Sequence, residues 1–529
     1  MTESTPASTL VSRFDYPSSR PSDHVEVLHG IEISDPYRWL EATDADHVGA
    51  WIAAQNELTY GFLEGIPQRD SIRGRMTELW RYERFGIPIK RGGRYFFTQN
   101  DGLQNQDVLF WAESMDEEPR LLLDPNILSA EGTVALMGRS VSRDGRLLAY
   151  GLSDSGSDWQ IWRVRDVESG QDLSDELRWV KWSAASWTQD NRGFFYSRYD
   201  KPESEEAYSA INYGHKLYFH RVGDRQEDDA LLFAQPDQKE WLFHGEVTED
   251  GRYLVITVAH GTHREQNILY CDLEAGRNVV ELLSEFRADY QFVGNDGENF
   301  FFLTDDGAAR YRVVSIDIRQ PEAHSWREIV AEADSTLQSA SLVGDKLIAI
   351  YLVDATSQVS VFSSAGSFER TIDLGCIGSV AGFEGSRDDP ETFYKLTGFT
   401  TPESIYRFDV NSGEQRLLRQ PAVDFDPDDF VTRQVWVRSN DGSRAPLYLT
   451  HRRDLVLNGE TPTYLYGYGG FNIPLTPTFS VSNLVWMERG GIYAHAILRG
   501  GGEYGKEWHM AGAKLEKQTS SMTSSPRQS

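Results

Sequence analysis

The strongest constraint on this chain is a unit that recurs through its middle. A turn of the Asp-Gly type precedes a strand-like run of β-branched and aromatic residues, at 144–145, 190–191, 250–251 and 296–297, with weaker copies at 344–345 and 388–389. The spacing of roughly 45–60 residues is the length of a four-stranded propeller blade, whereas sandwiches do not repeat at this length. Residues 82–430 have room for about seven units, so we expect a seven-bladed β-propeller. An irregular all-β sandwich is the alternative.

The two flanks have different patterns. Residues 36–76 carry apolar residues at three- and four-residue steps, which predicts helix, and Asp35-Pro36 is a plausible helix start. After Phe430, strand-like segments occupy 433–438, 445–450, 462–466 and 492–498, and glycine-rich turns follow the last two. Apolar strands that lead into glycine-rich loops indicate the beginning of an α/β sheet, in which ligands bind at the carboxyl ends of strands.

Composition excludes several functional classes. A formal net charge of −29 disfavours binding to nucleic acid or to an anionic membrane surface. Two cysteines fit a reducing compartment rather than a disulfide framework. The first sixteen residues show no secretory pattern, and no apolar run is long enough to span a bilayer. We therefore expect a cytoplasmic protein.

Ordered motifs along almost the whole chain identify a family resemblance. They are YLYGYGGFN at 464–472, RGGGEYGKEWH at 499–509, DPYRWLE at 35–41, GLQNQ at 102–106, LDPNIL at 123–128, GTVAL at 132–136 and SGSDW at 155–159. In this order they resemble prolyl oligopeptidases. The resemblance implies a seven-bladed β-propeller joined to an α/β-hydrolase domain that both chain ends build. We expect an N-terminal helical segment at 1–76 that packs on the hydrolase part, the propeller at 77–430, the first part of the hydrolase domain at 431–518, and an unrelated disordered tail at 519–529.

The reaction that the resemblance implies is hydrolysis of short peptides after proline, by a Ser-Asp-His triad without a cofactor. The triad serine of an α/β-hydrolase lies in a G-x-S-x-G turn, and none of the serines has this setting. After Gln518 the family pattern gives way to a low-complexity tail, as a frameshift or read-through would produce. We therefore expect a form truncated before the triad and inactive alone. A non-catalytic propeller that binds peptides and one half of a split enzyme remain alternatives.

The resemblance also assigns candidate site residues. Tyr468 matches the oxyanion tyrosine of the family, and Phe471 matches a wall of the pocket for the proline ring. Trp182, Leu242 and Thr262 match substrate neighbours in the propeller, and Asp158 is expected to line the domain interface. An ordinary buried tyrosine and ordinary packing on blade faces remain the alternative interpretations. The partners expected are short proline-containing peptides, with no nucleic acid and no membrane.

Two further motifs are interpreted as structural. Gly500-x-Gly502-x-x-Gly505 lacks the second strand and acidic residue of a dinucleotide site, and His260-Gly-Thr-His263 has no third metal ligand near it in sequence. By resemblance, the hydrolase strand order is 1-2-4-3-5-6-7-8. Strand 463–466 would then be an uncovered apolar edge that favours aggregation, although family members are mostly monomeric.

Overall fold

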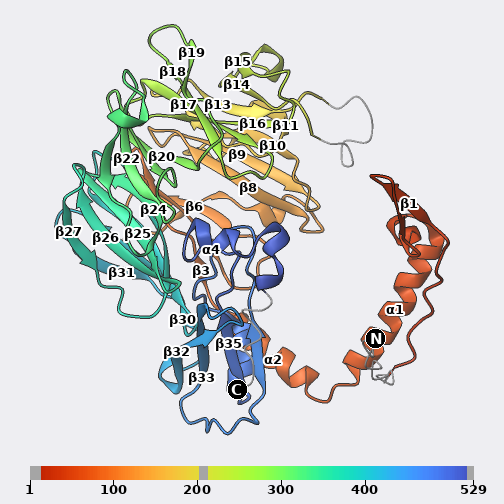
Figure 1. Cartoon of the computed structure of the whole chain (residues 1–529). Helices are drawn as coiled ribbons and strands as arrows, with labels where there is room; N and C mark the ends of the chain where they lie inside the picture. Colours follow the sequence, from red (N-terminus) through yellow and green to blue (C-terminus); the bar gives the residue numbers. More distant parts are fainter. Residues whose placement is uncertain (1–13, 202–211, 521–529) are drawn as a thin grey trace. The chain divides into compact units, whose positions relative to one another are not determined.

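The computed structural model describes residues 14–201 and 212–520 (Figure 1). The chain divides into two compact units, one up to Glu78 and one from Leu79 onwards, and each is described separately. None of the described helices combines the length and the apolar character that crossing a bilayer requires.

The first unit contains a hairpin followed by helices. Its elements are β1 (Val25–Leu28), β2 (Ile31–Ser34), η1 (Arg38–Glu41), α1 (Asp46–Glu64) and α2 (Arg69–Trp80), the last of which crosses into the second unit. The helix start predicted at Asp35-Pro36 is wrong, because only the 3-10 turn η1 follows it, with Arg38 of that turn paired to Asp35 at 2.8 Å, and α1 begins only at Asp46. The packing predicted between residues 1–76 and the hydrolase part stays a prediction.

Among its described residues, the second unit contains seven antiparallel sheets, each built from consecutive strands, which we call blades 1 to 7. Blade 1 comprises β3 (Arg84–Phe85), β4 (Ile89–Arg91), β5 (Arg94–Asn100), β6 (Val108–Ala112) and β7 (Arg120–Leu123). Blades 2 and 3 comprise β8 (Val134–Val141), β9 (Leu147–Asp154), β10 (Gln160–Asp166), β11 (Asp172–Val180), β12 (Ser186–Trp187), β13 (Gly193–Arg198), β14 (Lys216–Arg221) and β15 (Ala230–Ala234). Blades 4 and 5 comprise β16 (Trp241–Val247), β17 (Tyr253–His260), β18 (Gln266–Asp272), β19 (Val279–Leu283), β20 (Tyr290–Asp296), β21 (Asn299–Thr304), β22 (Arg312–Asp317) and β23 (Arg327–Val330). Blades 6 and 7 comprise β24 (Thr336–Val343), β25 (Lys346–Val353), β26 (Thr356–Ser363), β27 (Phe368–Ile372), β28 (Ser379–Glu384), β29 (Glu391–Gly398), β30 (Thr401–Asp409) and β31 (Gln415–Arg419). Short 3-10 turns lie at η2 (Pro125–Ile127), η4 (Gln226–Asp228), η5 (Ala323–Ser325) and η6 (Pro427–Asp429).

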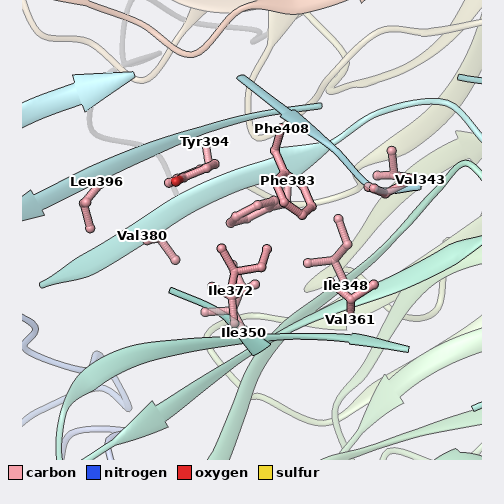
Figure 2. Close-up of a cluster of buried hydrophobic side chains, with 12 residues drawn as sticks. Val343, Ile348, Ile350, Val361, Ile372, Val380, Phe383, Tyr394, Leu396 and Phe408 are labelled. Carbon is pink, nitrogen blue, oxygen red and sulfur yellow. The ribbon is translucent and has the colours of Figure 1, made fainter. Parts of the chain in front are cut away.

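The blades close a ring through the cores that they share. Buried clusters join blade 1 to 2, 2 to 3, 3 to 4, 4 to 5, 5 to 6 and 6 to 7, and another cluster joins blade 7 back to blade 1. Figure 2 shows the cluster between blades 6 and 7, where Phe383 stacks on Tyr394 with ring centroids 4.6 Å apart. The seven-bladed propeller predicted from the repeat is therefore confirmed.

A smaller sheet follows the propeller in the chain, and we call it the C-terminal sheet. Its strands are β32 (Phe430–Arg438), β33 (Arg444–Arg452), β34 (Thr463–Tyr466) and β35 (Ile492–Ala496), in the order β32-β33-β35-β34, and its helical segments are α3 (Val481–Glu488), α4 (Lys506–Met510) and η7 (Lys514–Glu516). This order is the first half of the predicted 1-2-4-3-5-6-7-8. Strand β34 forms the edge, and all four of its residues are exposed, as predicted.

One face of the propeller contacts the C-terminal sheet. In each blade the turn between the second and third strands lies at the opposite end from the turn between the first and second, because neighbouring strands are antiparallel. Second-to-third turns make the contacts. Phe399 packs against Tyr448 and His495, and the carboxylate of Asp354 accepts a hydrogen bond from the hydroxyl of Tyr504 at 3.0 Å. We call this end of the ring the near face and the other end the far face.

Hydrogen bonds cross the ring at the far face. Glu249 lies on the first-to-second turn of blade 4, and its carboxylate accepts a hydrogen bond from the backbone N–H of Arg387 in blade 7 at 2.8 Å. From blade 2, the guanidinium of Arg143 donates to the carbonyls of Glu249 at 2.6 Å and Thr248 at 2.7 Å. These cross-ring bonds link blades that share no core.

The predicted tail at 519–529 lies outside the described residues from 521 onwards. Thr519 and Ser520 are described, and the hydroxyl of Ser520, which is 4% exposed, donates to the carbonyl of Arg499 at 2.6 Å. The described chain therefore stays attached to the C-terminal sheet up to Ser520.

Candidate functional site

Two glycine-rich loops meet at one edge of the C-terminal sheet. Strands β34 and β35 are parallel neighbours, so their carboxyl ends lie side by side. The loop after β34, which we call the 468–475 loop, contains Tyr468 and Phe471, and the loop after β35 contains the Arg499–Gly505 motif. The N–H of Asn472 donates to the carbonyl of Gly500 at 3.0 Å, so the two loops are joined directly.

The close approach of these loops explains the glycines of the Gly500-x-Gly502-x-x-Gly505 motif. An ideal Cβ on Gly500, where φ is +101°, would lie 2.3 Å from the carbonyl oxygen of Gly469. At Gly502 and Gly505 the obstacles would be the carbonyl oxygens of Asn472 and Ala309. These glycines are required by packing within the chain itself.

Ionic contacts anchor the base of the site. The guanidinium of Arg499, which is buried, pairs with Asp441 and donates to the hydroxyl of Ser439 at 2.9 Å. Hydrogen bonds from Arg499 hold the pKa of the Asp441 carboxyl well below its ordinary value. The ammonium of Lys517 donates to the carbonyl of Gly469 in the 468–475 loop. A charged side chain thus holds the backbone directly after Tyr468.

Tyr468 and Phe471 lie together and open to solvent. Their ring centroids are 6.5 Å apart, and they are 44% and 81% exposed. Phe471 has a φ of +53° and Asn472 a φ of +59°, in the left-handed region that residues with a Cβ rarely adopt. Such strain is typical of binding sites, where the surrounding structure holds a side chain in a required position. An exposed phenylalanine on a strained backbone is suited to receive an apolar ring.

The three propeller candidates line one cavity. Trp182, Leu242 and Thr262 share a pocket of about 590 Å³ with Tyr213 and Glu240. Thr262 lies on a second-to-third turn and Leu242 at the beginning of an innermost strand, so the pocket belongs to the near face. Neither Tyr468 nor Phe471 is among the residues that line this cavity.

Asp158 approaches this pocket only through another residue. Its carboxylate pairs with the ammonium of Lys181 at 3.3 Å, and that ammonium lies 4.5 Å from the ring centroid of Trp182. Lys181 is buried, and Trp182 has a φ of +51°. The adjacent cation fixes one face of the indole, while half of the Trp182 side chain stays exposed to the pocket.

Sequence reasoning missed Lys181, Tyr213 and Glu240. Lys181 directly precedes Trp182 in the sequence, so the sequence could have indicated it. Tyr213 and Glu240 line the pocket only because of the way blades 3 and 4 fold. His260, in the motif that resembles a metal ligand pair, bonds to Glu240 at 2.9 Å, and its ring stacks on that of His263. Within residues 14–201 and 212–520, no three His, Cys, Asp or Glu side chains are grouped so as to hold a metal ion.

Comparison with known families agrees with the fold and covers most of the chain. Residues 16–421 match the family model for the prolyl oligopeptidase N-terminal β-propeller domain. Residues 477–521 match the model of the prolyl oligopeptidase family.

The chain belongs to the prolyl oligopeptidase family.

Curated relatives of this prolyl oligopeptidase family member are peptidases. Prolyl endopeptidase of Elizabethkingia miricola is 38% identical over 503 residues, which are 95% of this chain and 71% of the relative. Prolyl oligopeptidase A of Amanita bisporigera is 32% identical over 546 aligned residues, again 95% of this chain and 71% of the relative.

Solved structures of the family have the same fold. One solved structure comes from an analysis of two prolyl endopeptidases and the role of their inter-domain dynamics. It superposes on this chain with a TM-score of 0.91 at 34% identity, and the match covers 96% of this chain and 75% of the other. Prolyl oligopeptidase B of Galerina marginata, bound to a 25-residue macrocyclization substrate, also superposes with a TM-score of 0.91, at 28% identity and with the same coverage.

Proposed function

We propose that this chain recognises proline-containing peptides at the near face of the propeller, as the substrate-binding part of a serine-type prolyl endopeptidase. The observation that supports this most directly is topological. The pocket of Trp182, Leu242 and Thr262 opens on the propeller face that contacts the C-terminal sheet, and this sheet carries the 468–475 loop. A peptide that lies between them can meet both groups of residues.

Each residue has a distinct proposed role. The exposed ring of Phe471 forms a wall for the proline ring, because two apolar rings gain free energy when they leave water together. The hydroxyl of Tyr468 donates to the oxyanion that develops at the scissile carbonyl during acyl transfer. Trp182, Leu242 and Thr262 receive an apolar part of the peptide farther from the cleavage point, and Asp158 holds Lys181 against Trp182.

Cleavage requires a nucleophile as well as these binding groups. In the reaction of the family, a serine attacks the carbonyl carbon, a histidine takes its proton, and an aspartate orients the histidine. The 529 residues contain no serine in the G-x-S-x-G setting. We therefore propose that this chain binds peptides but does not hydrolyse them alone. A cytoplasmic location belongs to the same proposal, and two free cysteines fit it. Family members are mostly monomeric, whereas the exposed edge strand β34 should make this chain prone to aggregation.

Peptide binding and serine reactivity test the proposal separately. We expect calorimetry to detect binding of an acetylated, amidated tetrapeptide with a Gly-Pro pair, and we expect the analogue with alanine in place of proline to bind more weakly. The variant Phe471→Ala should weaken binding of the proline peptide about tenfold. Phe368→Ala is the matched control, because Phe368 is also exposed, at 60%, but lies on the outer strand of blade 6.

A fluorescent fluorophosphonate, which labels activated serines, should leave the purified chain unlabelled. Equal affinity for the two peptides would refute proline recognition. Labelling together with turnover of the proline peptide would refute inactivity while supporting the assignment to prolyl peptidases.

A further inference from the structure

The 468–475 loop is attached to the rest of the molecule at a second point beyond Phe471. The N–H of Leu475 donates to carboxylate oxygen Oε1 of Glu503 at 2.7 Å. Together with the bond from Asn472 to Gly500, this contact holds the part of the loop in which Phe471 and Asn472 have positive φ. Glu503 therefore contacts the loop three residues beyond the strained Asn472, without contributing to the exposed surface of the loop.

Glu503 is an unusual residue because it is an almost completely buried carboxyl group. It is 1% exposed, and its oxygen Oε2 has no hydrogen-bond partner among the described residues. An ideal Cβ on Gly501 would lie 2.2 Å from Oε2, so only glycine at 501 leaves room for the carboxyl group. The geometry thus reserves a space for Glu503 beneath the loop.

The cations near Glu503 in sequence and space are engaged elsewhere. Arg499 pairs with Asp441, Lys506 pairs with Asp305 at 3.1 Å, and Lys517 donates to the carbonyl of Gly469. On its own segment, the neighbouring phenol of Tyr504 donates to Asp354. Burial raises the pKa of Glu503 from its usual 4.5 to about 7, against the opposing effect of the Leu475 N–H. The carboxyl group is accordingly protonated in weakly acidic solution.

We propose that Glu503 is a positioning residue for peptide binding, whose buried carboxyl group anchors Leu475 and thereby holds Phe471 and Tyr468 in their binding arrangement. The inference rests on the proposed function of the 468–475 loop. It concerns the loop conformation and not contact with the peptide, because Glu503 is buried.

The sign of the pH effect follows from linkage. The Leu475 N–H lowers the pKa of Glu503, so the anchoring bond is stronger to the ionised carboxylate than to the neutral acid. Anchoring therefore strengthens as the pH rises through the pKa of Glu503, about 7. Peptide affinity should follow the same course.

Two substitutions separate anchoring from mere packing. Glu503→Gln keeps a carbonyl oxygen that accepts the Leu475 N–H but removes the titration. Glu503→Ala removes the acceptor, so the Leu475 amide should exchange its hydrogen about tenfold faster, and the affinity for the acetylated Gly-Pro tetrapeptide should fall about tenfold. Glu507→Ala is the control, because Glu507 is an exposed glutamate on the adjacent α4.

Hydrogen exchange at Leu475 and peptide calorimetry from pH 5 to pH 8 are the two measurements on the full chain. We expect wild-type affinity to rise across this range, Glu503→Gln to bind nearly independently of pH, and Glu503→Ala to lose both protection and affinity. The proposal is overturned if Glu503→Ala leaves Leu475 exchange unchanged, or if it accelerates exchange with no loss of affinity. If the wild-type chain binds no proline peptide at all, the proposed function fails, while the exchange arm still decides whether Glu503 anchors the loop.

Discussion

The seam between blades 6 and 7 and the seam between blades 7 and 1 are built differently. Twelve buried residues form the first, among them Phe383, Tyr394 and Phe408 (Figure 2). Five buried residues, four from blade 1 and Phe393 from blade 7, form the second. Blades 6 and 7 follow each other in the chain, whereas the closing seam joins strands about 300 residues apart, as in the contact of Lys90 with Glu391.

Polar contacts at the closing seam, between blades 7 and 1, compensate for its smaller apolar core. Glu391, whose side chain is 7% exposed, accepts hydrogen bonds from the ammonium of Lys90 at 2.7 Å and from the hydroxyl of Tyr95 at 2.8 Å, and it pairs with Arg407. Lys90 also pairs with Asp389 at 2.7 Å, and these bonds raise the pKa of its ammonium although burial opposes them. One seam therefore depends on apolar packing and the other on charge.

The largest expected effect breaks the apolar seam. Phe408→Ala should lower the free energy of unfolding of the propeller by about 3–5 kcal/mol, because Phe408 is 1% exposed within a large rigid cluster. Phe97→Ala, in the smaller cluster of the closing seam, should cost less, because fewer neighbours surround the cavity. The urea denaturation midpoints of the two variants measure the two losses of stability. Equal losses would contradict the difference between the two seams.

A smaller effect is expected at the charged seam. Glu391→Gln keeps the size of the side chain but removes its charge, and it should cost about 1.5–3 kcal/mol, the usual value for hydrogen bonds to charged groups. A double-mutant cycle with Lys90→Met measures the coupling. Additive costs would show that the Lys90–Glu391 pair does not hold the seam together.

An effect that depends on pH is expected at a third seam, between blades 2 and 3. His220 is fully buried, and its ring bonds Asp175 of blade 2 at 2.9 Å and Asp229 of its own blade at 2.6 Å. Burial lowers the pKa of His220, but the two carboxylates outweigh it and raise the value from 6.5 to about 9. Because the folded-state pKa is raised, the stabilisation is complete below pH 6.5 and is lost as the pH rises through about 9.

Thermal midpoints between pH 7 and pH 10 test this third prediction. The wild-type chain should lose stability across that range, and His220→Gln should remove this component of the pH dependence. An unchanged slope in the variant would show that His220 does not carry it.

The sequence could predict local features but not the contacts that link distant blades. The turns at Gly145 and Gly251 have positive φ, as an Asp-Gly turn requires, and the strands after them begin where the pattern placed them. The hairpin of β1 and β2 was missed although His29-Gly30 separates two alternating runs, because the apolar pattern that follows favoured helix. A pattern within one segment cannot show that Arg143 reaches Glu249, which lies 106 positions away.

The candidate site shows the same limit. Motifs placed Tyr468 and Phe471 on a loop after a strand, and the fold groups Trp182, Leu242 and Thr262 around one cavity. The motif that contains Glu503 is recognisable in the sequence, but the sequence alone does not show that this carboxyl group is buried beneath the 468–475 loop. Burial depends on the neighbouring strand, and that is a property of the folded sheet.

The cross-ring bonds of Glu249 brace the far face of the propeller. Through Arg143 and Arg387 they join blades 2, 4 and 7, none of which is the neighbour of another in the ring. Any spreading of these blades at the far face must therefore first break hydrogen bonds that do not belong to a seam between neighbouring blades.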